Sequence, residues 1–386
     1  MNSKLLLFWI FLRLGLTSFG GPVAHLGYFR EEFVNRRRWF TEEEYADKVA
    51  LCQLIPGPAS SQTGLLIGYQ REGYLGALLA WFGFTLPSAL ALGYLGITLA
   101  NPEVSLSPLL LTLLKAIAIA VILQAVIGMA RTFCITRAHQ LLMLASASAL
   151  TLAAASWLTP LLIIGAGLIS LMSNKSALAP SKLDWRIDRS SMLWLFLFFA
   201  GLLVLPLVTT GSNSITQMFN SFFRAGALVM GGGHVVLPLL ADATVTTGLI
   251  SSEAFISGYG AAQAVPGPLF TFAAFLGGAL DGTASSAAIA TIAIFLPAVA
   301  LLFGVFPIWE RLKTDARVRL VISGANAAVV GVLLAALLTI TIQTLTSLYV
   351  GLAVLVAFGL LQWFKIPAWI LVAVTVVISL VEALIV

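Results

Sequence analysis

The sequence predicts an all-α polytopic membrane protein made of two related halves in opposite orientations. Apolar residues make up 60% of its 386 residues, charged residues only 10%, and the mean hydropathy is +1.01. A soluble domain needs a charged surface, typically about a quarter of its residues. This chain lacks those charges, and its length suffices for roughly a dozen membrane segments of about 20 residues each.

Motifs of the first half recur in the second half at a nearly constant distance along the chain. The offset is 210 or 211 positions at every matched motif. Spacing that regular indicates an internal duplication. The matched motifs are Phe11-Leu-Arg13-Leu-Gly15 with Phe222-Phe-Arg224-Ala-Gly226, Gly20-Gly21 with Gly231-Gly232, Gln53-Leu-Ile-Pro56-Gly57-Pro58 with Gln263-Ala-Val-Pro266-Gly267-Pro268, and Pro87 with Pro297.

The duplication divides the chain into three parts. Residues 1–173 are the first repeat, residues 214–386 are the second, and residues 174–213 are a basic linker with one extra transmembrane segment. Each repeat has six apolar segments, so about 13 hydrophobic segments are expected in all. Because an odd number of segments precedes the second repeat, the two repeats would have inverted topology, a common plan among transporters.

The basic residues leave the number of crossings open. With thirteen spans and a cytoplasmic N-terminus, the connection Arg30–Lys48 falls outside, although Lys and Arg usually accumulate in cytoplasmic loops. The breaks Gly20-Gly21-Pro22 and Pro56-Gly57-Pro58 interrupt helices, so each early segment could instead re-enter on one side. Thr41 and Glu44 have the spacing of a capping box that would start such a half-helix. Nine crossings would then remain, with that connection inside.

Two arginines lie deep in apolar segments at matched positions, Arg13 and Arg224. A cation at the centre of a bilayer costs about 3 kcal/mol or more, so an intramembrane charge indicates a functional site. The alternative is an arginine that extends to the interface or binds backbone carbonyls. Lys115 also lies in an apolar run but has no basic counterpart, which favours either extension of its side chain to the interface or a local structural pairing.

The glycine and proline breaks predict an anion site. A half-helix that begins inside the membrane directs unsatisfied N–H groups and a positive dipole end to that point, and such ends bind anions. The alternative is that the breaks are simple kinks. The predicted substrate-binding residues are Arg13, Gly20, Gly21, Gln53, Pro56, Gly57, Pro58, Arg224, Gly231, Gly232, Gln263, Pro266, Gly267 and Pro268.

Other functional classes find little support in the sequence. Polar residues near the breaks, such as His25 and Gln62, could donate to an oxyanion or only connect helices. The two cysteines and three histidines have no disulfide or metal spacing, so we expect no metal and no cofactor. An intramembrane enzyme would need a paired acid and base, and the sequence shows none. ATP hydrolysis would need a Walker-type loop and nucleic-acid binding a soluble basic domain, and the sequence has neither.

The motifs resemble those of the chromate ion transporter family in its two-domain form. The similar stretches are Phe19-Gly-Gly-Pro-Val-Ala-His-Leu, Leu51-Cys-Gln-Leu-Ile-Pro-Gly-Pro-Ala-Ser-Ser-Gln, Met230-Gly-Gly-Gly-His and Gln263-Ala-Val-Pro-Gly-Pro, and they cover both halves. The resemblance implies a multi-pass inner-membrane protein that exports chromate from the cytoplasm, driven by the membrane potential or by protons. It also implies thirteen spans with oppositely oriented halves.

The resemblance leaves the cargo open between chromate and another tetrahedral oxyanion such as sulfate. The two anions share charge and shape, and no residue of this sequence separates them. A channel would also fit the composition, and a flux that depends only on voltage would favour it. The sequence does not indicate the oligomeric state.

Overall fold

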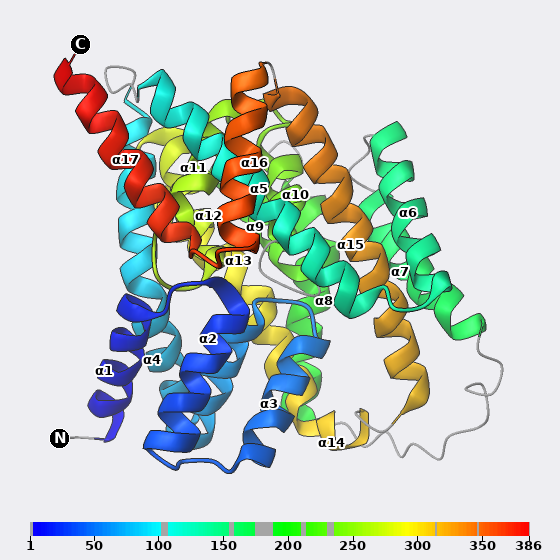
Figure 1. Ribbon diagram of the computed structural model, residues 1–386. Coiled ribbons are helices and arrows are strands. Elements are labelled where there is room, and N and C mark those ends of the chain that lie inside the picture. Colours follow the sequence, from blue (N-terminus) through cyan, green and yellow to red (C-terminus); the bar gives the residue numbers. More distant parts are fainter. Residues whose placement is uncertain are drawn as a thin grey trace.

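The computed structural model describes residues 3–101, 107–153, 158–173, 188–209, 214–229, 235–312, 315–345 and 347–385. Within these ranges all regular secondary structure is helical, which confirms the predicted all-α fold (Figure 1). The chain begins at the lower end of the molecule in Figure 1 and finishes at its upper end. Most of the predicted basic linker, from residue 174 to residue 187, lies outside the described residues.

The first helices of the chain are short and reverse direction at the Gly-Gly motif. Helix α1 (Ser3–Thr17) is followed by α2 (Gly21–Arg30), a π-helical turn (Glu31–Arg36) and α3 (Glu42–Leu54). The start of α1 and the connection from α2 to α3 lie at the same end of the molecule (Figure 1). Helix α3 begins with the predicted capping box, since the Thr41 hydroxyl accepts from the Glu44 N–H and the Glu44 carboxylate accepts from the Thr41 N–H.

Helix α4 (Ala59–Leu99) consists of two antiparallel arms. The backbone leaves helical geometry at Glu72 and Gly73, where Gly73 has φ +65°. In a straight helix, Gly68 and Gly76 would lie about 12 Å apart. Here a Cβ atom added to Gly68 would collide with the Gly76 carbonyl, so the chain has turned back on itself. The lower arm, residues 59–71, therefore returns to the end of the molecule where α3 began. The upper arm, residues 74–99, runs the length of the molecule.

The remaining helices follow in two groups. After α4 come α5 (Pro108–Phe133), α6 (Arg137–Leu152), α7 (Leu158–Met172) and α8 (Arg189–Thr209). The second half contains α9 (Ser214–Leu228), α10 (Val236–Thr244), α11 (Ser252–Ala262), the 3₁₀ turn η4 (Leu269–Thr271), α12 (Phe272–Asp281), α13 (Ala284–Val305), η5 (Phe306–Ile308), α14 (Trp309–Leu312), α15 (Ala316–Thr344), α16 (Leu348–Gln362) and α17 (Ala368–Ile385).

Helices of the two halves interleave. Helix α15 of the second half packs on α6 and α7 of the first, while α5 of the first half packs on α16 and α17 of the second. Glycines make these contacts close, because a Cβ at Gly324 would collide with the Ala166 carbonyl and one at Gly331 with the Met143 carbonyl. Small residues allow such close approach of membrane helices. The two halves therefore pack together through interleaved helices.

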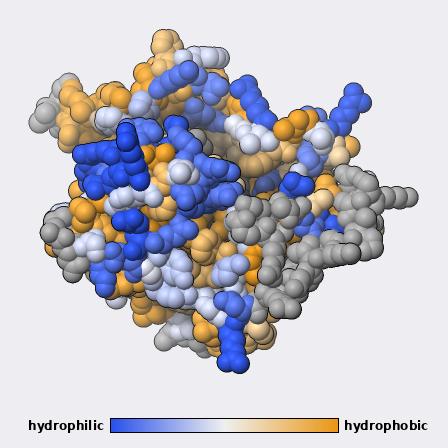
Figure 2. Space-filling model, turned by 90° about the horizontal axis from the view of Figure 1, so that it is seen from below, coloured by the Kyte–Doolittle hydropathy of each residue, from blue (hydrophilic) through white to orange (hydrophobic). Residues whose placement is uncertain are grey.

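The surface is that of a multi-pass membrane protein. Five described helices are long and apolar enough to cross a bilayer by length and composition, namely α4, α5, α8, α13 extended by η5, and α15. Large apolar side chains cover α8, where Phe196 is 67% exposed and Leu207 is 76% exposed. An apolar surface of this kind is unfavourable in water and stable against lipid. Hydrophilic residues gather at the lower end of the molecule (Figure 2).

Two non-glycine residues of the described ranges have left-handed backbone geometry, and both are basic. Arg38 has φ +52° and Lys365 has φ +54°. The left-handed conformation costs an ordinary residue about 1–2 kcal/mol, and glycine adopts it freely. Arg38 lies in the connection between α2 and α3, and Lys365 lies between α16 and α17.

Candidate functional site

Two Pro-Gly-Pro breaks interrupt the helices at matched positions. The first break, Pro56–Pro58, connects α3 with α4, and the second break, Pro266–Pro268, connects α11 with η4. Gly57 has φ +129° and Gly267 has φ +107°. Side chains rarely tolerate this geometry, so both positions require glycine.

The backbone of each break is hydrogen-bonded to the opposite half. The Gly57 N–H donates to the carbonyl of Val229 after α9, with a distance of 2.7 Å. The Gly267 N–H donates to the carbonyl of Ser18 after α1, with a distance of 3.0 Å. Val229 follows Ser18 by 211 positions, so matched groups of the two halves form a crossed pair of bonds. These two N–H groups are therefore used within the protein.

The side chains that cover the two glycines are also matched. A Cβ at Gly57 would lie 2.7 Å from the Ala298 Cβ on α13, and a Cβ at Gly267 would lie 2.7 Å from the Ser88 Oγ on α4. Ala298 follows Ser88 by 210 positions. Each break therefore packs against the long helix of the opposite half, one residue after the proline inside that helix.

A cavity of about 160 Å³ lies beside the second break. That volume is roughly ten times the 10–15 Å³ that one water needs, so the cavity has room for a small hydrated ion. Five predicted site residues line it: Gly20, Gly21, Gln263, Gly267 and Pro268. The Gly-Gly break of one half and the Pro-Gly-Pro break of the other thus share one cavity.

The donors at this cavity are neutral. The Gln263 side-chain amide is buried and lies beside the Tyr259 hydroxyl, and its nitrogen makes no hydrogen bond of standard geometry among the described residues. Helix α2 begins at the cavity, with Gly20 and Gly21 in left-handed geometry (φ +99° and +79°) and no side chain capping its first N–H groups. Free N–H groups at a helix N-terminus attract anions. None of the described residues that line the cavity carries a charged side chain.

Three further elements complete the cavity wall. Helix α5 contributes Val121 and Gln124, and the ends of α16 and α17 contribute Leu361 and Trp369 among others. The Gln124 amide donates to the Leu361 carbonyl (3.2 Å) and so joins two walls. Sequence reasoning missed these residues. A glutamine in the apolar middle of α5 was a usable signal for Gln124, whereas Leu361 and Trp369 carry no local signal.

The first break is filled by a side chain instead. The Gln62 side-chain nitrogen donates to the Pro56 carbonyl (2.9 Å) and to the Ala298 carbonyl (3.4 Å), and Gln62 is fully buried. Gln53, the counterpart of Gln263, is exposed at the end of α3. Neither Gln53 nor the residues Pro56, Gly57 and Pro58 line the cavity described above.

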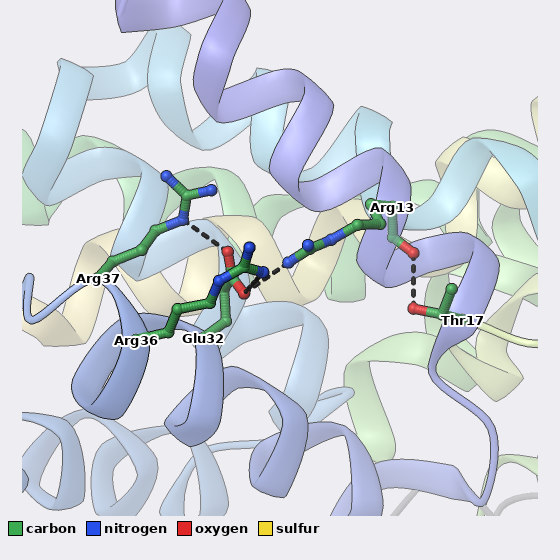
Figure 3. Close-up of polar contacts among 5 residues, drawn as sticks. All are labelled: Arg13, Thr17, Glu32, Arg36 and Arg37. Atoms are coloured by element: carbon green, nitrogen blue, oxygen red, sulfur yellow. Dashed lines mark hydrogen bonds and ion pairs between the residues drawn. The ribbon is translucent and has the colours of Figure 1, made fainter.

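Arg13 lies in an ion-pair cluster away from the cavity lining. Its guanidinium donates to the Glu32 carboxylate (2.5 Å), which also accepts from Arg36 (3.3 Å) and Arg37 (2.6 Å) (Figure 3). Burial alone would raise the pKa of Glu32, but the hydrogen bond from Arg37 and the charges of Arg13 and Arg37 outweigh burial and lower it. The role of Arg13 in anion binding stays a prediction.

The remaining predicted residues are less informative. Arg224 is half-buried on α9 and has no hydrogen bond or ion pair within the described part of the chain. Gly231 and Gly232 lie outside the described residues. Pro266 belongs to the second break but is not a lining residue. Lys115 pairs with Glu253 on α11 (2.5 Å), one of the two structural roles that its lack of a basic counterpart favoured.

His25 binds two groups of the first half near the second break but does not line the cavity. Its Nε2 lies 3.1 Å from the Ser18 carbonyl, the same carbonyl that accepts from Gly267, and its Nδ1 lies 3.4 Å from the Ser60 hydroxyl. Because a carbonyl only accepts, Nε2 carries the proton. His25 therefore holds α1, α2 and α4 in place around the point where the second break is bound.

Comparison with known proteins assigns the family. The chromate transporter family model matches residues 5–171 and 216–380, nearly the whole chain. A chromate transport protein of Pseudomonas aeruginosa is 28% identical over 91% of this chain and 85% of its own length. A chromate transport protein of Cupriavidus metallidurans is 27% identical over 92% of this chain and 87% of its own.

An uncharacterized transporter of Methanocaldococcus jannaschii is also similar, with 27% identity over 93% of this chain and 90% of its own length. No solved structure matches the chain. The two matched segments coincide with the two halves that share the crossed breaks. The chain belongs to the chromate transporter family, in its two-domain form, and is not an enzyme.

Proposed function

We propose that the protein is a secondary transporter that exports chromate from the cytoplasm across the inner membrane and thereby confers chromate resistance. The cavity between the Gly-Gly break and the second break would bind the anion. The observation that carries this proposal is the buried Gln263 amide, which lies beside the Tyr259 hydroxyl at the wall of a cavity that α2 enters with its N-terminus. A tetrahedral oxyanion has four acceptor oxygens and suits these donors.

Neutral donors fit a cargo that must be released again. A dianion bound by several cationic side chains would dissociate slowly. Amide and backbone N–H groups bind it through their dipoles instead, which favours release. Two of the relatives are named chromate transport proteins. Sulfate has the same shape and charge as chromate. Sulfate or another oxyanion is therefore the alternative cargo for the same cavity.

We further propose that the two halves are inverted repeats with re-entrant segments. The crossed bonds from Gly57 to Val229 and from Gly267 to Ser18 support a two-fold relation between the halves. The short helices α1, α2 and α3 and the lower arm of α4 support re-entry, because a full crossing needs about 20 residues. The connection Arg30–Lys48 would then be cytoplasmic, like the N-terminus (Figure 1). Nine full crossings would remain in place of thirteen.

The transport experiment uses purified protein in proteoliposomes. We expect saturable uptake of labelled chromate, with sulfate as a competitor that reveals the preferred cargo. Imposing a proton gradient at zero membrane potential, and then a potential at equal pH, separates proton coupling from electrical driving and from a channel. Chromate flux no faster than in protein-free vesicles would contradict the proposal.

The topology experiment uses a single reporter cysteine at Asn35 in a chain without Cys52 and Cys134. Asn35 is exposed in the turn after α2. The re-entrant arrangement predicts no labelling by an impermeant thiol reagent in intact cells and labelling after permeabilisation. Labelling from outside intact cells would restore thirteen simple spans.

A further inference from the structure

The connection between α16 and α17 carries a lysine next to the cavity. Leu361 before it and Pro367, Ala368 and Trp369 after it all line the cavity. Lys365 is two residues from Pro367, so their Cα atoms lie within about 7.6 Å of each other.

This connection lies in the middle of the molecule rather than at either end. It lies beside the connection between α1 and α2 (Figure 1), and the rings of Phe19 and Trp369 join the two connections with centroids 5.0 Å apart. The helices on both sides of Lys365 are almost wholly apolar. A cation in such surroundings is costly and indicates a functional role.

Local structure does not account for a lysine at this position. Its left-handed backbone (φ +54°) favours glycine, and the Ile366 N–H closes the end of α16 by donating to the Leu360 carbonyl (3.0 Å) without using the Lys365 side chain. The Lys365 side chain is exposed and has no hydrogen bond or ion pair within the described part of the chain. A strained residue beside a cavity is a common feature of functional sites.

We propose that Lys365 supplies the positive charge that attracts the dianion to the cavity and selects it over monoanions. This inference rests on the proposed transport function and adds a residue to that site. The described lining residues carry no charge, so a nearby ammonium would dominate the potential there. Lysine is a compact charge on a flexible stem, so its ammonium group can move with the anion as the anion enters the cavity.

The test replaces Lys365 by glycine and uses Arg38→Gly as the matched control. Both substitutions remove one cation from a left-handed position, so both proteins should melt at the same temperature as the parent or higher. Arg38 lies in the connection between α2 and α3, away from the cavity lining. We expect Lys365→Gly to raise the KM for chromate at least tenfold in proteoliposomes and Arg38→Gly to change it less than twofold.

Two further variants complete the test. Lys365→Arg keeps the charge and should restore the KM to within threefold of the parent, whereas Lys365→Asn tolerates the backbone and should behave like glycine. A Lys365→Gly protein with the KM of the parent would overturn the inference. If the parent itself shows no saturable chromate flux, the proposed function fails instead, so the two failures are distinguishable.

Discussion

The two Pro-Gly-Pro breaks have the same backbone and different surroundings. Both glycines donate to the opposite half and pack against its long helix at matched residues. The first break is closed by Gln62, whose amide binds two backbone carbonyls, and the corresponding side chain at the second break is Phe272. The second break borders the cavity, and its glutamine amide binds no backbone carbonyl there. Both breaks thus join the two halves, and only the second has a cavity beside it among the described residues.

The largest expected effect distinguishes the two matched glutamines. Gln263→Leu keeps much of the volume of the side chain and removes its amide donor, so chromate loses a hydrogen bond that is worth about 1.5–3 kcal/mol because the anion is charged. We expect the KM for chromate to rise roughly 10- to 100-fold. Gln53→Leu, at the exposed end of α3, is the control and should change the KM less than twofold. Equal effects of the two variants would contradict the difference between the breaks.

The next effect tests what the breaks share. Gly57→Ala and Gly267→Ala each place a Cβ in contact with the opposite half and force alanine into a glycine conformation, which costs about 1–3 kcal/mol for the backbone alone. Both should lower the melting temperature by several degrees in detergent. Adding Ser88→Gly should recover part of the loss for Gly267→Ala and none for Gly57→Ala. Recovery in both would show that the packing is not specific to each break.

A smaller effect tests the closure of the first break. Gln62→Leu leaves the Pro56 and Ala298 carbonyls without their side-chain donor, and a buried unsatisfied group costs about 1–3 kcal/mol. We expect a lower melting temperature with an unchanged KM for chromate. A raised KM at normal stability would indicate that the first break also binds the anion.

The smallest effect concerns Glu32, which is remote from both breaks. Its folded-state pKa is lowered by Arg37 and Arg13, so its contribution to stability is complete above the unfolded value of about 4.3 and is lost as the pH falls through the lowered pKa. The melting temperature of Glu32→Gln should therefore fall less between pH 5 and pH 3 than that of the parent. Parallel pH curves would show that Glu32 does not contribute in this way.

Part of this architecture could be predicted from the sequence. The all-α class follows from composition, the capping box from the spacing of Thr41 and Glu44, and the breaks from their proline and glycine residues. Matching the two repeats selected positions where a helix must break. Five of the predicted site residues at such breaks line the cavity. The repeat-matched glutamines could not be told apart, since their difference depends on which helices of the opposite half cover each break.

Other features depended on contacts between distant segments. The ion pair of Arg13 with Glu32 requires α2 to fold back beside α1, and sequence reasoning placed this arginine by depth alone. The expectation that the breaks offer free backbone donors does not extend to Gly57 and Gly267, whose N–H groups bind carbonyls of the other half. The wall formed by Leu361 and Trp369 comes from the far end of the chain and has no local signature.

The most direct test is anomalous diffraction at the chromium edge from crystals of the protein grown with chromate. The account predicts an anomalous peak in the cavity beside the second break, within hydrogen-bond distance of the Gln263 side-chain nitrogen and close to the N-terminus of α2. Loss of that peak in Gln263→Leu crystals would confirm the assignment. A strong peak only at Arg13 or Arg224, with the cavity empty, would contradict it.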